Sequence, residues 1–179
     1  ETRALALDAA ELIEVDFDEL PSVTDTARAA AGKAAVWDEC PDNISNVFET
    51  GDGAATDAAF AKAAKIVYRR YVISRVYAHF MEPRGVIGNY DPGEDRYTLY
   101  ADVQYPHRVR NALASKIFKI PENKMRVIAG DVGGGFGTKG WQYPEHRLML
   151  WASRKLGRPV KWSCERQEAI LADEHGRDN

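Results

Sequence analysis

The spacing of hydrophobic and polar positions predicts four helices along the chain. The clearest pattern lies in residues 106–120, where Val109, Leu113 and Ile117 recur at every fourth position and form one apolar stripe. Pro106 suits the first turn of this helix, because the missing proline N–H has no partner there. The other predicted helices are Arg3–Leu12, Asp57–Lys65 and residues 143–157.

The predicted helix over residues 143–157 carries matching signals at both ends. Pro144 fits its first turn, and Glu145 suits the positive end of the helix dipole. Gly157 is placed to cap the far end in a left-handed conformation. These signals set the expected bounds of the helix.

Alternating and β-branched stretches predict strands between these helices. The longest is residues 65–79, in which Val67, Tyr71 and Ile73 would share one face. The motif "DPGEDR", residues 91–96, predicts a turn between two shorter strands. The shorter strands are expected at residues 13–17, 84–91, 96–104, 124–132 and 159–164.

The order of these elements favours an α+β fold, with a mixed sheet and packed helices. Residues 124–164 run through a strand, a glycine-rich loop, a helix and a strand, which resembles one α/β unit. The strand-rich stretch before them makes a mixed sheet the stronger expectation. Residues 31–57 contain Gly32, Pro41 and Gly51 and show no apolar period, so they predict an extended connector.

Composition and charge exclude several classes of function. The net charge of −3 disfavours a general nucleic-acid binder, because phosphate backbones select basic surfaces. No run of about 18 apolar residues is present, so no membrane span is expected, and no signal peptide is visible. Cys40 and Cys164 form no CxxC pair, which agrees with a reducing, cytoplasmic location. The four histidines lack zinc-ligand spacing.

The motif that carries chemistry is "GDVGGGFGTKG", residues 130–140, in which six of eleven residues are glycine. Glycine lets main-chain N–H groups approach a ligand, so a cradle for a phosphate or cofactor is one interpretation. A tight turn between closely packed backbones is a second. A dinucleotide site using Gly135, Gly137 and Gly140 is a third, although the acidic residue expected about 20 positions later is missing. On the residues alone, all three stay open.

Several ordered motifs resemble the large, molybdopterin-binding subunit of the molybdenum hydroxylases, the family of xanthine dehydrogenase, aldehyde oxidase and aerobic carbon monoxide dehydrogenase. The stretches "QYPHRVR" and "YPEHRLMLWASRKLGRPVKW" are most similar to the bacterial carbon monoxide dehydrogenase group. The resemblance implies that the chain is an internal fragment of such a subunit. The motifs that carry it are "HFMEPRG", "VQYPHRVRNALASKIFKIPENKMRVI", "DVGGGFGTK", "LGRPVKW" and "ERQEAILADEHGRDN".

This resemblance implies three parts and an activity for the parent protein. Residues 1–30 would end an α/β-hammerhead domain, 31–55 would be an extended linker, and 56–179 would be the first, truncated part of the molybdopterin-binding domain. The parent would be a molybdenum-dependent oxidoreductase that hydroxylates its substrate with water or oxidises carbon monoxide. The isolated chain is expected to be inactive, because the glutamate base and the active-site loop would lie beyond Asn179.

The resemblance also implies a cofactor and the residues that bind it. The cofactor would be molybdopterin with molybdenum, in the cytosine dinucleotide form, with copper in carbon monoxide-oxidising members; the isolated fragment is expected to lack it. Gln104 matches the glutamine whose amide faces the molybdenum oxo ligand, and Phe136 matches the residue that shapes substrate access. No catalytic residue and no metal ligand is expected within the chain. The residues expected to bind the cofactor are Gln104, Gly133, Gly134, Gly135, Phe136 and Gly137.

The expected partners are an iron–sulfur subunit, an FAD subunit and the rest of the large subunit, in a dimer of heterotrimers.

Gly140 stands where purine-oxidising members have a glutamate, which argues against purine selection. Glu82 is expected to form a structural ion pair with Arg84 or Arg75 rather than to act as a catalytic acid. The alternatives are a Rossmann-like dinucleotide-binding module, using the three glycines named above, and a non-catalytic docking module.

Overall fold

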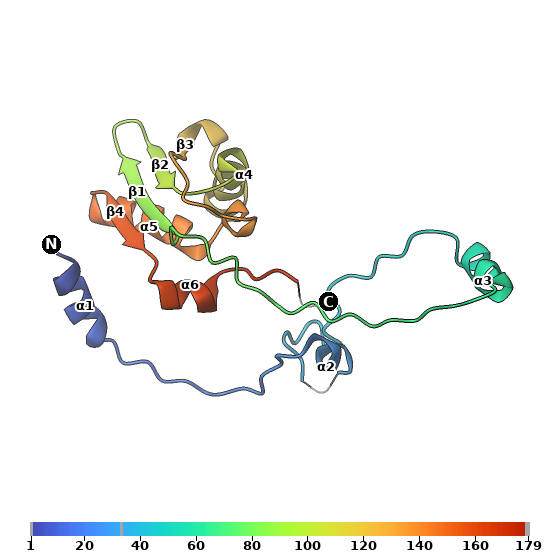
Figure 1. Cartoon of the computed structure of the whole chain (residues 1–179). Coiled ribbons are helices and arrows are strands. Elements are labelled where there is room, and N and C mark those ends of the chain that lie inside the picture. Colours follow the sequence, from blue (N-terminus) through green and yellow to red (C-terminus); the bar gives the residue numbers. More distant parts are fainter. Residues whose placement is uncertain (1, 33, 178–179) are drawn as a thin grey trace. The chain divides into compact units, whose positions relative to one another are not determined.

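A computed structural model describes residues 2–32 and 34–177 of the chain. Contacts between residues divide the chain into two units, Glu1–Tyr71 and Val72–Asn179. Figure 1 labels the helices and strands of both units. Within the residues described, no helix is long and apolar enough to cross a lipid bilayer.

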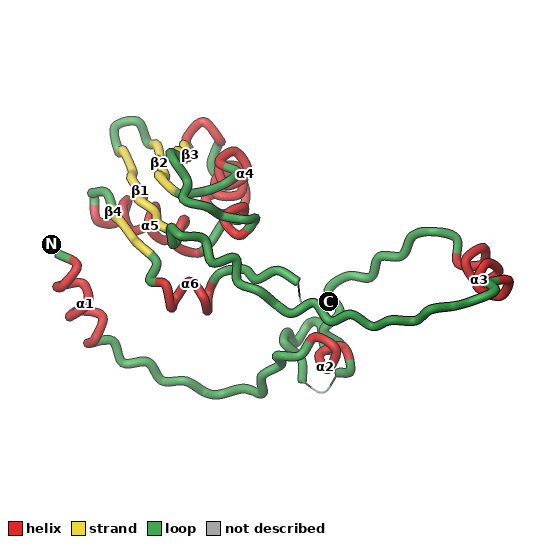
Figure 2. Tube along the Cα trace, in the orientation of Figure 1, coloured by secondary structure: helices red, strands yellow, loops and turns green. Residues whose placement is uncertain are grey.

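The first unit consists of three short helices joined by extended chain (Figure 2). Each helix begins after a residue whose side-chain oxygen accepts a main-chain N–H from the first turn, namely Thr2, Asp25 and Asp52. None of the three helices buries a residue. The sequence pattern predicted the first helix to within one residue, predicted the third with a later start, and missed the second. The helices are α1 (Arg3–Glu11), α2 (Thr26–Ala30) and α3 (Gly53–Lys62).

Two of the predicted strands were wrong. Residues 13–17 have no regular structure, and the side chain of Phe17 is 77% exposed. Residues 65–79 are extended chain with a single bridge, in which Val76 and Gly176 exchange N–H···O bonds of 3.1 and 3.2 Å. The β-branched residues of these stretches predicted strands, yet a strand also needs a neighbour to take its main-chain hydrogen bonds. The described residues supply that neighbour only at the bridge.

The second unit is built on a four-stranded mixed sheet in the order β3-β2-β1-β4. β1 runs antiparallel to β2 and to β4, whereas β2 and β3 are parallel. The register places Val86 opposite Ala101 on β2 and Trp162 on β4. The α+β class with a mixed sheet is therefore confirmed, with strands somewhat shorter than predicted. The strands are β1 (Gly85–Asp91), β2 (Arg96–Ala101), β3 (Met125–Ile128) and β4 (Val160–Ser163).

Helices cover one face of this sheet. The helix predicted over residues 106–120 forms as α4 (Pro106–Asn111) followed by a π-helical stretch, Ala112–Phe118. The helix predicted over residues 143–157 forms as α5 (Pro144–Leu156), which packs against β1, β2 and β4. It ends at Gly157 with φ 65°, as the glycine at that position indicated. A further helix, α6 (Arg166–Ala172), was not predicted.

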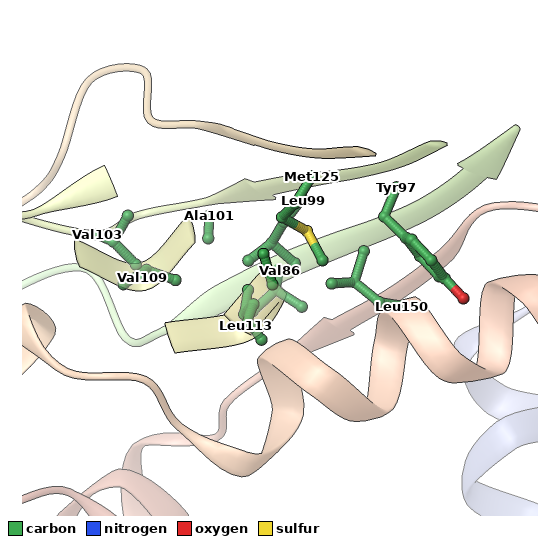
Figure 3. Packing of buried hydrophobic residues seen from close by; sticks show 10 residues of the cluster. Val86, Tyr97, Leu99, Ala101, Val103, Val109, Leu113, Met125 and Leu150 are labelled. Atoms are coloured by element: carbon green, nitrogen blue, oxygen red, sulfur yellow. The ribbon is translucent and has the colours of Figure 1, made fainter. Parts of the chain in front are cut away.

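The hydrophobic core lies between this face and the helices (Figure 3). Val109 and Leu113 from the predicted stripe are buried, and Leu150 of α5 is fully buried against them. A Cβ at Gly88 would collide with the main chain of Met149, so this glycine permits the close approach of α5 to β1. The sheet contributes Val86, Tyr97, Leu99, Ala101 and Met125 to this core.

The strand arrangement does not favour a Rossmann-like module. The glycine loop and α5 lie between β3 and β4 in the sequence, and these two strands occupy opposite edges of the sheet. An antiparallel pair, β2 and β1, separates them. A dinucleotide-binding unit would instead place its strands in a parallel sheet, with the glycine loop leading directly into a helix.

Candidate functional site

The glycine loop follows β3 and holds conformations that ordinary residues rarely adopt. Gly134 and Gly137 have φ values of 92° and 96°, and Phe136 between them has φ 47°. The loop ends in a 3-10 turn, Thr138–Gly140, before α5 begins at Pro144. The Phe136 side chain is 78% exposed. The loop is therefore a folded structure of its own rather than the N-terminal turn of the long helix.

Gln104, which follows β2, is hydrogen-bonded to this loop. Its side-chain Oε1 accepts the N–H of Gly137 at 2.9 Å, and its own main-chain N–H donates to the carbonyl of Lys139 at 3.0 Å. With the amide oxygen engaged in this way, the amide NH₂ is the end of the side chain that can donate to a ligand. A Cβ at Gly135 would lie 2.6 Å from Oε1, so a side chain at this position would require the Gln104 amide or the loop to shift.

Three consecutive main-chain N–H groups of the loop have no acceptor within the described part of the chain. They belong to Gly134, Gly135 and Phe136. Main-chain N–H groups generally find a partner in protein, water or ligand. A run of such donors beside the Gln104 amide is an arrangement that can bind an electronegative group.

A buried lysine lies beside the loop. The side chain of Lys139 is 1% exposed and forms ion pairs with Glu82, at 2.9 Å, and with Asp102. Burial alone would raise the pKa of Glu82, but hydrogen bonds from Lys139 and the Gly133 N–H outweigh it and lower that pKa. For Asp102 burial dominates and raises the pKa, because hydrogen bonds from the Gly85 N–H and Lys139 offset it only in part.

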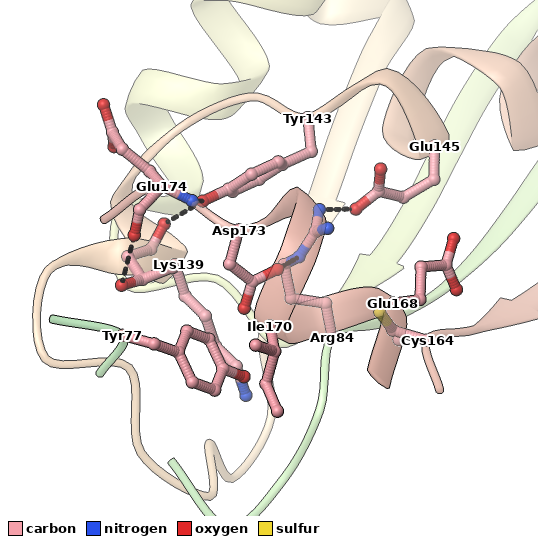
Figure 4. A network of polar contacts seen from close by, with 12 residues as sticks. Tyr77, Arg84, Lys139, Tyr143, Glu145, Cys164, Glu168, Ile170, Asp173 and Glu174 are labelled. Atoms are coloured by element: carbon pink, nitrogen blue, oxygen red, sulfur yellow. Dashed lines mark hydrogen bonds and ion pairs between the residues drawn. The ribbon is translucent and has the colours of Figure 1, made fainter. Parts of the chain in front are cut away.

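A second buried cation, Arg84, joins three elements of the second unit (Figure 4). Its guanidinium forms ion pairs with Glu145 at the start of α5 and with Asp173 after α6, the latter at 2.6 Å. The same group stacks 3.7 Å from the ring centroid of Tyr143. Burial raises the pKa of Glu145, and the neighbouring Arg84 opposes that shift.

Tyr143 extends this network to the turn after the glycine loop. Its hydroxyl donates to the carbonyl of Thr138 at 3.0 Å and accepts the N–H of Glu174 at 3.2 Å. His146, one turn along α5, is buried and accepts the N–H of Tyr143 at Nδ1. Burial, helped by the charge of Arg84, lowers the pKa of His146 to about 4, so the imidazole is neutral near pH 7.

A hollow of about 420 Å³ opens beside Phe136 and Gly137. On its wall the guanidinium of Arg108 stacks 3.9 Å from the ring centroid of Trp141. The other lining residues are Tyr105, Thr138, Gly140, Glu174, His175 and Gly176. The exposed aromatic ring and the loop glycine thus border a space large enough for a small molecule.

The structure brings together all six residues expected to bind the cofactor, in the loop and on the segment after β2.

Glu82 forms an ion pair as predicted, but with Lys139 in place of the predicted arginine partners, and Arg84 pairs elsewhere. Lys139 and Asp102 were not among the predicted site residues. A lysine beside glycines looks like an ordinary surface residue, and nothing local marks Asp102 as its partner. No group of three or more potential metal-binding side chains occurs within residues 2–32 and 34–177. Cys40 and Cys164 are free thiols.

Comparisons with known proteins relate the chain to one family. The profile of the molybdopterin cofactor-binding domain matches residues 36–179. Among curated proteins, the carbon monoxide dehydrogenase large chain of Hydrogenophaga pseudoflava is 37% identical over 189 residues and matches 98% of this chain. The nicotine 6-hydroxylase large subunit of Paenarthrobacter nicotinovorans is 37% identical over 178 residues and matches 99% of it.

A solved structure agrees with these relationships. The crystal structure of a Cu,Mo-CO dehydrogenase in the carbon monoxide reduced state superimposes with a TM-score of 0.87 and 34% sequence identity, over 98% of this chain. The chain spans less than a quarter of each of these proteins: 23% and 22% of the two curated relatives and 24% of the solved chain. The match therefore concerns one region of a much larger polypeptide.

Proposed function

The chain belongs to the molybdopterin cofactor-binding domain family, and from this premise we propose that it forms one wall of the cofactor site in a molybdenum-dependent oxidoreductase. The proposed parent is the large subunit of a hydroxylase or dehydrogenase of the kind to which its relatives belong. The observation that carries the proposal is the hydrogen bond from the Gly137 N–H to Gln104 Oε1. It leaves the amide NH₂ as the donor beside three loop N–H groups that have no acceptor among the described residues.

The residues present fit such a cofactor. The N–H groups of Gly134, Gly135 and Phe136, which have no acceptor within the residues the structure describes, and the amide of Gln104 are donors, and the cofactor offers oxygen, sulfur and phosphate acceptors. Gly133 precedes these three donors in the loop, and its own N–H is bonded to Glu82. When bound, the molybdenum centre supplies two-electron oxidation of the substrate, with water as the source of oxygen.

In this proposal, each residue of the chain has a limited task. The NH₂ of Gln104 would donate a hydrogen bond to the bound cofactor and so orient the acceptor atom that it contacts. Gly135 keeps a side chain away from the Gln104 amide, because a Cβ there would meet Oε1 at 2.6 Å. Phe136, whose ring is 78% exposed beside the hollow, limits the size and approach of the substrate. The base that moves a proton would come from another segment of the parent.

The finer identity of the cofactor and substrate also belongs to this proposal. We propose the cytosine dinucleotide form of molybdopterin for the full-length parent. We propose copper only if the parent carries a loop cysteine, because neither Cys40 nor Cys164 matches the copper-binding position of the family. Carbon monoxide and nicotine appear in the names of the two relatives. Both classes, a small gas and N-heterocycles, are therefore substrates to test.

The proposed partners are the rest of the large subunit, an iron–sulfur subunit and an FAD subunit. Support comes from the first unit, whose helices α1, α2 and α3 bury no residue. Apolar side chains in that unit, such as Leu12 at 84% and Leu20 at 84% exposed, require cover from further polypeptide. We propose that residues 1–30 end a hammerhead domain that supplies part of this cover.

The test is metal and cofactor analysis of the full-length protein purified with its partner subunits. The proposal expects molybdenum and a pterin in equal amounts with the large subunit, and turnover of carbon monoxide, an aldehyde or an N-heterocycle with an artificial electron acceptor. Absence of molybdenum and pterin from the folded complex would refute it. Tight binding of NAD or FAD to the 179-residue chain by calorimetry would favour the dinucleotide-binding alternative instead.

A further inference from the structure

The ion pair between the buried Lys139 and the partly exposed Glu82 connects the two ends of the glycine loop. Glu82 Oε2 accepts the N–H of Gly133 at 2.7 Å, at the beginning of the loop, and also accepts from Lys139 Nζ at 2.9 Å, at its end. The main-chain N–H of Glu82 in turn donates to the carbonyl of Gly133 at 3.3 Å. One carboxylate therefore holds both ends of the loop at once.

The other contacts of Lys139 lead to Gln104. The carbonyl of Lys139 accepts the N–H of Gln104 at 3.0 Å, while its ammonium group pairs with Asp102, two positions before Gln104. The ammonium group also lies 4.7 Å from the ring centroid of Phe80. Lys139 is thus fixed on every side, and its position sets where Gln104 and the loop meet.

Burying an ammonium group costs free energy and is therefore an inefficient means of stabilising a turn. Its desolvation costs several kcal/mol, as an order of magnitude, and apolar replacements of buried ion pairs are often neutral or better for stability. The ion pairs have a clearer role in orientation, because charged hydrogen bonds specify the positions of Gly133 and Gln104 in a way that apolar packing would not. Residues that orient ligand-binding groups in this manner strongly affect metal and cofactor affinity.

We propose that Glu82 and Lys139 are positioning residues, which hold the glycine loop and Gln104 in the conformation that receives the cofactor. This inference rests on the proposed function of the loop. Neither residue touches the reacting atoms in this proposal. Their effect is exerted through Gly133 and Gln104, so the loss of either contact changes cofactor loading before it changes the chemistry of a loaded site.

Glu82 is the better residue to replace, because Asp102 still neutralises Lys139 when Glu82 is absent. Its side chain is 43% exposed, so the change leaves little buried void. Glu82→Ala removes the acceptor of the Gly133 N–H, whereas Glu82→Gln retains an oxygen for it. Glu122→Ala is a matched control, since that glutamate is 41% exposed and pairs with Arg110 away from the loop.

The experiment uses the full-length complex and compares the parent, these three variants and Lys139→Met. The first readout is molybdenum per large subunit, measured by plasma mass spectrometry. The second is hydrogen exchange of peptides spanning residues 130–140 in protein grown without molybdenum. We expect Glu82→Ala to lose about tenfold in molybdenum content, the scale seen when groups that orient ligands are removed. Exchange in the loop should become faster, while Glu82→Gln and Glu122→Ala stay near the parent.

The outcomes separate this inference from the proposed function. A parent complex without molybdenum would refute the proposed function and, with it, the positioning role. A loaded parent together with a Glu82→Ala variant of parental molybdenum content and loop exchange would refute the positioning role alone. If Lys139→Met does not fold, the Glu82 variants still decide the result.

Discussion

The side-chain oxygen of Gln104 accepts the main-chain N–H of Gly137 at 2.9 Å. These two residues are 33 positions apart in the sequence, one after β2 and the other in the loop after β3. The bond sets the orientation of the amide, since Oε1 is engaged by the loop and the NH₂ remains the group that can donate elsewhere. This is the relationship on which the proposed cofactor contact depends.

Replacing Gln104 with alanine in the full-length enzyme should reduce turnover much more than stability. The variant loses one donor directed at the ligand, and the loss of one such preorganised donor typically costs about a hundredfold in kcat. The lost hydrogen bond to Gly137 should cost only about 1 kcal/mol of unfolding free energy. Steady-state kinetics and thermal unfolding of the same preparation measure both effects.

Gln104→Glu separates the two functions of this side chain. A carboxylate still accepts the N–H of Gly137 but cannot donate, so loop geometry should be kept while turnover falls as in Gln104→Ala. Parental turnover in Gln104→Glu would show that the donor role is mistaken.

Adding a single methyl group to Gly135 should block cofactor loading. Its Cβ would lie 2.6 Å from Oε1 of Gln104, so either the amide or the loop must move. Gly130→Ala is the matched control, because a Cβ there meets nothing within 4 Å. We expect low molybdenum content in Gly135→Ala and parental content in Gly130→Ala, measured on the purified complex. Equal loading of the two variants would contradict the close packing of Gln104 on the loop.

Removing the buried Arg84 should destabilise the second unit severely. Arg84→Met leaves the carboxylates of Glu145 and Asp173 without their cation, and breaking a buried pair in this way costs about 3–5 kcal/mol. The exposed pair of Arg96 and Glu94 provides the comparison, and Arg96→Met should cost less than about 1 kcal/mol. Urea unfolding followed by circular dichroism measures the difference. Similar losses in the two variants would mean that the Arg84 network contributes little.

The stability of the chain should fall as the pH drops from about 6.5 to about 4, because of His146. Its pKa is lowered from 6.5 to about 4 in the folded state, so the unfolded chain binds more protons throughout this window. The contribution is present above pH 6.5, is lost towards pH 4, and amounts to about 3 kcal/mol.

The matched variant for this prediction is His146→Gln, which cannot titrate. Its unfolding free energy, measured by urea titration at several pH values, should depend less steeply on pH between 6.5 and 4 than that of the parent. Glu145 and Asp102, whose pKa values are raised, contribute the opposite slope at the acid end in both proteins. The difference between the two curves therefore isolates the histidine, and identical curves would refute the assignment.

The sequence by itself determined the local elements of the second unit. The period of Val109 and Leu113 predicted a helix with a buried face, and Gly157 marked the end of α5. The ordered motifs also predicted the family, which the match over residues 36–179 shows. These features could be predicted because period, capping and motif order are properties of neighbouring residues.

Only the tertiary structure decided which side chains meet. β propensity predicted strands at residues 13–17 and 65–79, but no described neighbour pairs with them beyond the bridge at Val76. The buried charges of Lys139 and Arg84 found carboxylates 37 or more positions away, at Asp102, Glu82, Glu145 and Asp173. Ion pairs and strand pairing join residues that are distant in sequence, and their partners are set by the folded backbone, which no local pattern specifies.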